Sequence, residues 1–234
     1  MSTEPTRADA PLHPGADEAA ITAPTLLRLI REAIRIQRAG LKSYGLLVAS
    51  PAEPGFPFLA SDVVFLDQTH NRRNDAANRA AFHAQGAYFR DHDDAGFVAD
   101  PTDVLNAFRR IEERGFEVVA AFHSHRRQPA NFSSIDFRLH DPTVPWHLIL
   151  SFRNRDVPEL QPFRVTKDLD CGFGISADDC LEGSEQTYDG PEVAPLNLVV
   201  TGDAIEVGAC AGLLGQARTG WPGVLTATSV DAWR

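Results

Sequence analysis

The sequence has few cysteines and no long apolar run, and each shortage excludes a class of protein. Its cysteines, Cys171, Cys180 and Cys210, form no Cys-x-x-Cys pair and leave an odd count. A disulfide framework is therefore not expected, and a reducing compartment is the simpler assumption. No apolar stretch is long enough to span a membrane, and residues 1–24 lack the apolar segment of a secretory signal. We therefore expect a cytoplasmic protein without a membrane partner.

Positive charge is scarce as well. The chain has 22 Lys and Arg residues against 32 Asp and Glu residues, a formal net charge of −10. This balance argues against a general nucleic-acid binder or a binder of anionic membranes. Apolar residues make up 43% and charged residues 23% of the 234 positions, which is ordinary for a globular protein that can bury a proper core.

Composition and hydrophobic patterning divide the chain into three parts. Residues 1–24 are polar, acidic and rich in Ala and Pro, which predicts a disordered tail. Residues 25–165 carry the convincing helix and strand patterns and should form the core. In residues 166–234 an acidic loop without EF-hand spacing precedes Leu196–Val200 and Ala204–Gly208, which predict a β-hairpin extension.

Within the core, helix and strand patterns come in a clear order. A helix capped by Thr25 and ended by Gly40 precedes two apolar strands, and a second helix starts at Asp100. The expected strands are Tyr44–Ala49 and Ser61–Leu66, and the apolar stripe of the second helix is Val104, Phe108 and Ile111. The polar connection 67–99 contains His70, His83 and His92, which we interpret as surface or rim residues; a segment of this kind can also be a substrate-binding loop.

The most informative stretch is the pattern His-x-His-x7-Ser-x2-Asp, formed by His123, His125, Ser133 and Asp136. It follows the apolar run Glu117–Ala121, which predicts a buried strand. Residues i and i+2 of a strand point to the same face, so both imidazoles should project together. Two imidazoles and a carboxylate, with a fourth position left for water, are typical of catalytic zinc.

The order of these elements, together with the motif, resembles the JAMM (MPN-type) metalloprotease family over roughly residues 25–165. The resemblance implies an α/β (α+β) fold, a curved mixed β-sheet flanked by helices, with zinc at one end of the sheet. It also implies hydrolysis of an amide or isopeptide bond at the Gly-Gly end of a ubiquitin-like or sulfur-carrier protein. Its zinc ligands would be His123, His125 and Asp136, and Ser133 would donate to the developing oxyanion.

Two positions depart from the family pattern. Lys42 stands where the family has a catalytic glutamate, so it is either an unusual base or a residue that points to solvent, with the base lost. Arg126 and Arg127 follow His125, where the family often has proline, and they either bind a substrate carboxylate or form an exposed basic turn. Two further functions stay open: a metal enzyme of altered chemistry on a small substrate, and a metal-bearing but catalytically silent binding module.

Overall fold

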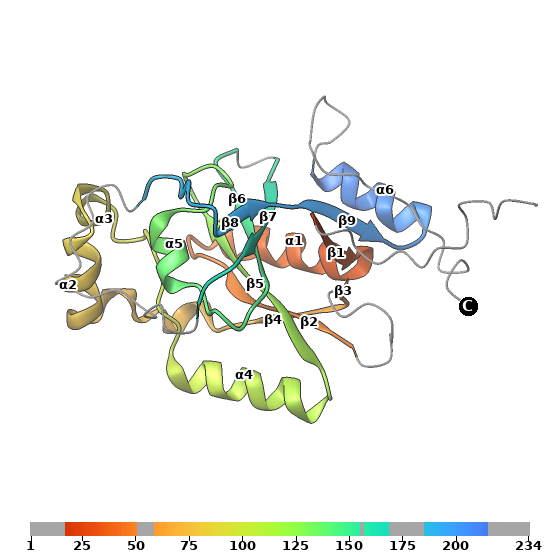
Figure 1. Ribbon diagram of the computed structural model, residues 1–234, viewed down its shortest axis with the longest axis horizontal. Helices are drawn as coiled ribbons and strands as arrows, with labels where there is room; N and C mark the ends of the chain where they lie inside the picture. Colours follow the sequence, from red (N-terminus) through yellow and green to blue (C-terminus); the bar gives the residue numbers. More distant parts are fainter. Residues whose placement is uncertain (1–16, 51–58, 155–156, 169–184, 215–234) are drawn as a thin grey trace, which may run out of the picture.

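The computed structural model describes residues 17–50, 59–154, 157–168 and 185–214. Six strands form the main sheet, in the spatial order β4, β2, β5, β6, β7, β8 (Figure 1). They are β2 (Tyr44–Ala49), β4 (Asp62–Phe65), β5 (Glu117–His125), β6 (Trp146–Ser151), β7 (Glu159–Val165) and β8 (Val193–Pro195). β5 and β6 run parallel, and the other neighbours run antiparallel. The predicted fold class, a mixed sheet flanked by helices, is confirmed.

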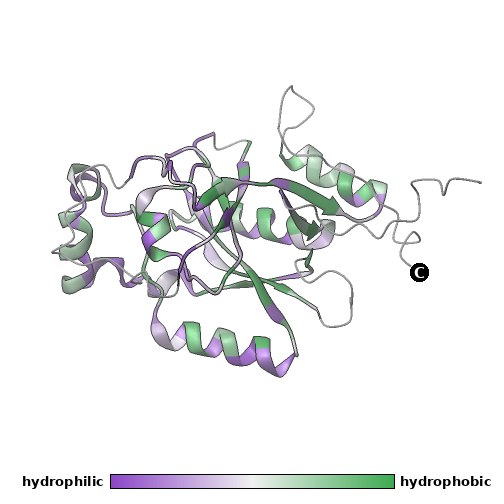
Figure 2. Ribbon diagram, viewed as in Figure 1, coloured by the Kyte–Doolittle hydropathy of each residue, from purple (hydrophilic) through white to green (hydrophobic). Residues whose placement is uncertain are grey.

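Helices α1 (Ala23–Arg38) and α4 (Pro101–Glu113) cover opposite faces of this sheet (Figure 1). Successive side chains of a strand alternate between faces. Leu47 of β2 accordingly belongs to the core under α1, whereas its neighbours Leu46 and Val48 pack with Ile111 of α4. Figure 2 shows the hydrophobic colour concentrated on the strands between the helices. None of the described helices is long and apolar enough to cross a membrane.

The caps explain where these helices begin and end. α1 starts earlier than predicted, because Thr22 rather than Thr25 is its N-cap and accepts from the backbone N–H of Thr25. Gly40, with φ of +79°, follows the last turn as expected. Asp100 caps α4 as predicted. The predicted stripe of α4 is wrong at Phe108, which is 42% exposed.

A second sheet corrects the prediction of a disordered tail over residues 1–24. Residues 1–16 lie outside the described part, but Glu18–Thr22 forms strand β1, which pairs in parallel with β9 (Asn197–Thr201) and β3 (Leu59–Ala60). The β1 sequence is short and alanine-rich, so its local preference for a strand is weak. Pairing with residues far along the chain decides its conformation.

The predicted C-terminal hairpin is also wrong. β9 is a strand, but Ala204–Leu213 forms helix α6. Asp203 accepts from the backbone N–H groups of Ile205 and Glu206, which starts a helix rather than a turn. Val207 and Cys210 then lie three residues apart on one face and join the core beside α1.

The connection 67–99 is a folded segment with four short helical pieces. They are η1 (Gln68–His70), η2 (Arg72–Asn74), α2 (Ala76–Ala84) and α3 (Ala87–Asp91). Arg73 is 1% exposed and binds the carbonyl oxygens of Ala95 and Phe89, which ties the two ends of the segment together. We call residues 67–99 the cover segment, because its apolar residues pack on Ile135 of helix α5 (Ser134–Leu139), beside the motif.

Candidate metal centre

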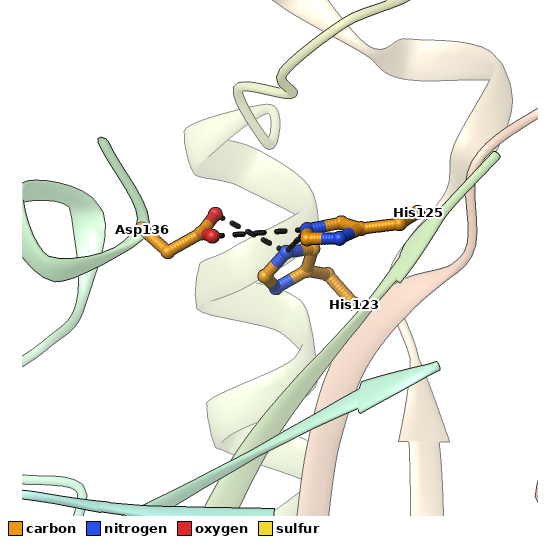
Figure 3. A group of neighbouring side chains, drawn as sticks. All are labelled: His123, His125 and Asp136. Atoms are coloured by element: carbon orange, nitrogen blue, oxygen red, sulfur yellow. Dashed lines mark hydrogen bonds and ion pairs between the residues drawn. The ribbon is translucent and has the colours of Figure 1, made fainter. Parts of the chain in front are cut away.

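The motif residues meet at the C-terminal end of β5. His123 and His125 occupy alternate positions of that strand and point to the same side of the sheet. Asp136 reaches them from α5, which forms part of the connection between the parallel strands β5 and β6. Figure 3 shows the three side chains converging from these two elements. Ligand sites commonly lie outside the carboxyl ends of parallel strands.

Three ligand atoms come close together in this arrangement. The Nε2 atoms of His123 and His125 are 2.9 Å apart. Asp136 places Oδ1 3.2 Å from Nε2 of His123 and Oδ2 3.7 Å from Nε2 of His125. For a tetrahedral zinc ion with ligand distances near 2.0–2.1 Å, ligand atoms are about 3.3 Å apart. The observed separations bracket that value, so the donor set fits such an ion.

The carboxylate of Asp136 is held in position by Ser133, the N-cap of α5. Ser133 donates its backbone N–H and its hydroxyl to Oδ2 of Asp136, at 2.9 and 2.6 Å, and its Oγ accepts from the backbone N–H of Asp136 at 3.2 Å. This reciprocal capping box fixes one carboxylate oxygen by two hydrogen bonds. The hydroxyl has one proton, and it is used here on Asp136. The predicted role of Ser133 as oxyanion donor stays a prediction.

A chain of buried histidines lies behind His123 and determines which of its ring nitrogens carries the hydrogen. His140 Nε2 is 2.8 Å from the carbonyl oxygen of Val144, which can only accept, so this nitrogen carries the hydrogen. The neutral His140 then accepts on Nδ1 from Nδ1 of His147, at 3.1 Å. His147 in turn accepts on Nε2 from Nδ1 of His123, at 2.7 Å. Nε2 of His123 is therefore left as a lone pair that faces the other ligands.

His125 is oriented by a single contact of the same kind. Its Nδ1 is 2.8 Å from the carbonyl oxygen of Pro129, so Nδ1 donates and Nε2 faces the other ligands. A metal ion at the centre would accept the lone pairs of both Nε2 atoms and bind the carboxylate of Asp136. A hydrogen bond from Nδ1 to an acceptor is the support that metal-ligating histidines usually have.

Burial also favours the neutral form of the histidines at and behind the centre. His123 and His147 are 2% and 6% exposed, and burial lowers the pKa of both imidazoles, so they are neutral. Burial opposes ionisation of Asp136, but the adjacent His123 and His125 hold the pKa of this carboxyl well below its ordinary value. The neutral imidazole of His123 and the carboxylate of Asp136 are in the protonation states that metal binding needs.

Comparison with known proteins agrees with this geometry. The family model of prokaryotic homologs of the JAB domain matches residues 61–166, which include the whole motif and a little under half of the chain. This match supports the JAMM (MPN-type) family for residues 61–166, and we call the motif with its pocket the JAMM centre. No curated protein matches the sequence.

Solved structures of similar outline come from bacteria and an archaeon. A protein from Desulfitobacterium hafniense is 20% identical with a TM-score of 0.48, and the match covers 78% of this chain and 92% of that one. A JAB1/MPN domain protein from Archaeoglobus fulgidus is 14% identical with a TM-score of 0.36, over 71% and 98% of the two chains. A protein from Salinibacter ruber is 17% identical with a TM-score of 0.40, over 75% and 98%.

Lys42 lines the pocket of the JAMM centre rather than pointing away from it. The pocket has a volume of about 50 Å³, and its lining includes Lys42, His123, His125 and Asp136. Burial lowers the pKa of the Lys42 ammonium to about 8, although the charges of Asp136 and Asp94 oppose the shift. Lys42 takes the sequence position expected for the family's glutamate and lies in this pocket. Its ammonium group loses a proton more readily than that of an ordinary lysine.

Arg126 and Arg127 also line this pocket, but they bind a carboxylate of the same chain. Asp94 of the cover segment lies 2.7 Å from the NH1 atoms of both arginines. This three-residue contact joins the cover segment to the residues that follow His125 in the metal motif. Arg126 Nε is buried without an acceptor in the described part of the chain, so one donor beside the JAMM centre stays available.

The sequence did not identify several residues of the JAMM centre. His147 is a buried histidine whose contact with His123 depends on the pairing of β5 with β6. Phe97 stacks on Tyr44, with ring centroids 4.4 Å apart, and lies over His123. Glu185 lines the pocket from the far end of the chain. No local pattern marks these residues, because each is placed by tertiary structure.

The histidines that we interpreted as surface or rim residues are more exposed than those of the motif. His70 is exposed, and His83 and His92 are half-buried. The fold brings His70 to 3.0 Å from Asp103 and 3.6 Å from Asp67, but this group lies at the surface and has the form of an ordinary ion pair.

Proposed function

We propose that this protein is a zinc-dependent hydrolase that cleaves an amide or isopeptide bond at the Gly-Gly end of a ubiquitin-like or sulfur-carrier protein. The observation that carries the proposal is the convergence of two imidazoles and one carboxylate, with ligand atoms 2.9 to 3.7 Å apart. A zinc ion bound there supplies Lewis-acid chemistry, which polarises a carbonyl group and makes water acidic near neutral pH.

The dimensions of the pocket support a substrate of this kind. A volume of about 50 Å³ is room for an ion and a few water molecules. A narrow chain fits such a pocket best, and two glycines in succession are the narrowest stretch of polypeptide. The aromatic residues Tyr88 and Phe97 of the cover segment stand along the same pocket and restrict it further.

The contacts of Arg126 and Arg127 support a role for these residues in binding the leaving group. Arg126 and Arg127 already bind one carboxylate, that of Asp94, and Arg126 keeps a buried donor without a partner. A residue or short peptide released from the C-terminus of a carrier protein has an α-carboxylate. We infer that this carboxylate binds the two arginines, in competition with Asp94.

The proposal is tested with the full chain, purified without chelator. The probe is a carrier protein of ubiquitin fold that ends in Gly-Gly and is extended by a short peptide. We expect one zinc ion per chain and release of the peptide after the second glycine, measured by mass spectrometry. A chain without zinc would contradict the proposal, and so would intact probe after prolonged incubation with the zinc-loaded protein.

One observation favours a second candidate, a zinc-bearing module that binds the carrier protein without cleaving it. Lys42 replaces the family glutamate, and the proton of the Ser133 hydroxyl is used on Asp136. Tight binding of the extended carrier with zinc present and no cleavage would favour this module over the hydrolase.

A further inference from the structure

Glu185 brings a third carboxylate into the pocket, in addition to those of Asp94 and Asp136. Among the described lining residues it is the one that comes from residues 166–234. Lys42, two residues before β2, lines the same pocket. A lysine and a glutamate from distant parts of the chain thus line one pocket.

The position of Glu185 is fixed by the residues that follow it. Gln186 accepts on its carbonyl oxygen from the backbone N–H of Ser134, at 3.2 Å. The backbone N–H of Tyr188 donates to the carbonyl oxygen of Phe132 at 2.7 Å, and its ring stacks on Phe137 with centroids 4.4 Å apart. The chain after Glu185 is therefore pinned along the first turn of α5, next to Ser133.

One oxygen of the Glu185 carboxylate has no partner among the described residues. Its Oε2 atom is buried and has no hydrogen-bond partner in the part of the chain that the structure describes. A buried polar atom without a partner is costly, and where it occurs in a native protein it commonly has a catalytic role or an absent ligand.

Glu185 is also not a fourth ligand. The atoms of His123, His125 and Asp136 all lie within 4.8 Å of one another, and Glu185 does not join this group among the described residues. It therefore stands in the pocket but outside the first set of ligands, which is where a proton acceptor for a reacting water molecule belongs.

We propose that Glu185 is the general base of the hydrolysis and that Lys42 is the oxyanion donor, so that two segments share the work of the family glutamate and serine. This inference rests on the proposed function. The family base is absent at position 42, and the hydroxyl proton of Ser133 is already donated to Asp136. A carboxylate and an ammonium group in the same pocket supply the acceptor and the donor that are missing.

The step balances with water as the only added reactant. Glu185 takes one proton from a water molecule as the water oxygen bonds to the amide carbon, and the carbonyl oxygen gains the negative charge. The Lys42 ammonium group donates a hydrogen bond to that oxygen. As the C–N bond breaks, Glu185 returns its proton to the leaving nitrogen, and the products are a carboxylic acid and an amine.

The test combines turnover with a probe that needs no turnover. Glu185→Gln keeps the shape of the side chain but removes the base, and Asp189→Asn changes an exposed carboxylate of the same segment as the control. On the extended Gly-Gly carrier we expect Glu185→Gln to lose about 10² to 10⁴ in kcat with little change in KM, and Asp189→Asn to lose less than about twofold. Lys42→Met should lose about 10²-fold or more.

The second probe is acetohydroxamic acid. Its two oxygen atoms bind a metal ion, and its acidic proton passes to a nearby base. Calorimetry on the zinc-loaded protein should show binding about ten- to a hundredfold weaker in Glu185→Gln and unchanged in Asp189→Asn. Zinc affinity, measured by chelator competition, should stay within about twofold in Glu185→Gln and should not fall in Lys42→Met, because removing a cation beside the ion does not weaken it.

The outcomes separate the two proposals. A wild-type chain without zinc overturns the proposed function and this inference together. Zinc-loaded wild type that cleaves the carrier or binds acetohydroxamic acid, with Glu185→Gln equal to Asp189→Asn, overturns the inference alone. A large loss of zinc in Glu185→Gln also overturns it, since Glu185 would then be a ligand. Zinc-loaded wild type that neither binds this probe nor cleaves the carrier overturns it as well.

Discussion

The two sides of the pocket are built in different ways. On the ligand side, His123, His125 and Asp136 fall within one short motif and are fixed by hydrogen bonds at nearly every polar atom. Lys42 and Glu185, which we call the opposite side, come from distant parts of the chain, and Oε2 of Glu185 has no partner among the described residues. The ligand side carries the complete motif and is held by many hydrogen bonds, whereas the opposite side combines residues that no local pattern brings together.

This difference indicates which part of the chemistry tolerates change. A metal site needs its ligand atoms within a few tenths of an ångström, so its positions and supports are constrained together. A proton acceptor needs only to reach the reacting water, and more than one segment can supply it. Variants of the ligand side should therefore lose zinc affinity, whereas variants of the opposite side should lose turnover and keep zinc.

The largest effect is expected on the ligand side, from His123→Ala. Structural zinc sites have apparent binding free energies of 10–16 kcal/mol, so one ligand of three or four contributes about 4 kcal/mol, or roughly a thousandfold in affinity. Chelator competition should show this loss, and His92→Ala at the rim should bind zinc as the wild type does. Equal affinities of the two variants would show that the motif is not the zinc site.

The histidines behind the ligands should have the next largest effect. His147→Leu removes the acceptor for Nδ1 of His123, and zinc affinity should fall about ten- to a hundredfold. His147→Gln offers an amide oxygen in place of the ring nitrogen and should recover part of the loss. In the metal-free wild type, ¹⁵N NMR of the imidazoles should find the hydrogen of His123 on Nδ1. A hydrogen on Nε2 would contradict the proton order that we assign.

On the opposite side, removal of a charge should stabilise the metal-free protein. Burial lowers the pKa of Lys42 from 10.5 to about 8, a shift that corresponds to about 3 kcal/mol against folding, reduced to about 1–2 kcal/mol by partial exposure. Lys42→Met should gain this amount at pH 7, where the lysine is charged in both states. The advantage should shrink as the pH rises from 8 toward 10.5, because the wild type then gains stability. Urea unfolding at pH 7 and 10 measures the difference, and a gain that is the same at both would contradict the account.

The smallest effect is expected from the contact between Asp94 and the two arginines. Asp94→Asn removes the carboxylate that competes with the substrate, at a half-exposed ion pair that contributes about 0.4–1 kcal/mol. We expect KM for the extended carrier to fall about two- to fivefold, with kcat unchanged. Asp93→Asn, at the exposed neighbouring position, serves as the control. A raised KM would show that Asp94 supports substrate binding instead.

The sequence predicted the ligand side well for a physical reason. Alternation on a strand and the cap of the following helix are local rules, and they place His123, His125 and Asp136 together without knowledge of the rest of the fold. The strands β2 and β5 were predicted from continuous apolar runs for the same reason. Asp203 gave a local signal that we misread, since a capping aspartate and Glu206 three residues later predict the start of α6.

The opposite side could not be predicted from local rules. Glu185 reaches the pocket through backbone pairing with residues about fifty positions earlier, and β1 exists because β9 pairs with it. Arg73 reads as one polar residue in a polar segment, yet it is buried and ties that segment together. Each of these placements depends on contacts between distant parts of the chain, which composition and periodicity do not encode.

The central claim is that His123, His125 and Asp136 bind a zinc ion. X-ray absorption at the zinc edge of the full chain, purified without chelator, tests it most directly. The account predicts one zinc ion per chain with a shell of nitrogen and oxygen atoms at about 2.0–2.1 Å and the outer scattering of two imidazoles. Absence of zinc, or a shell that contains sulfur at about 2.3 Å, would contradict it.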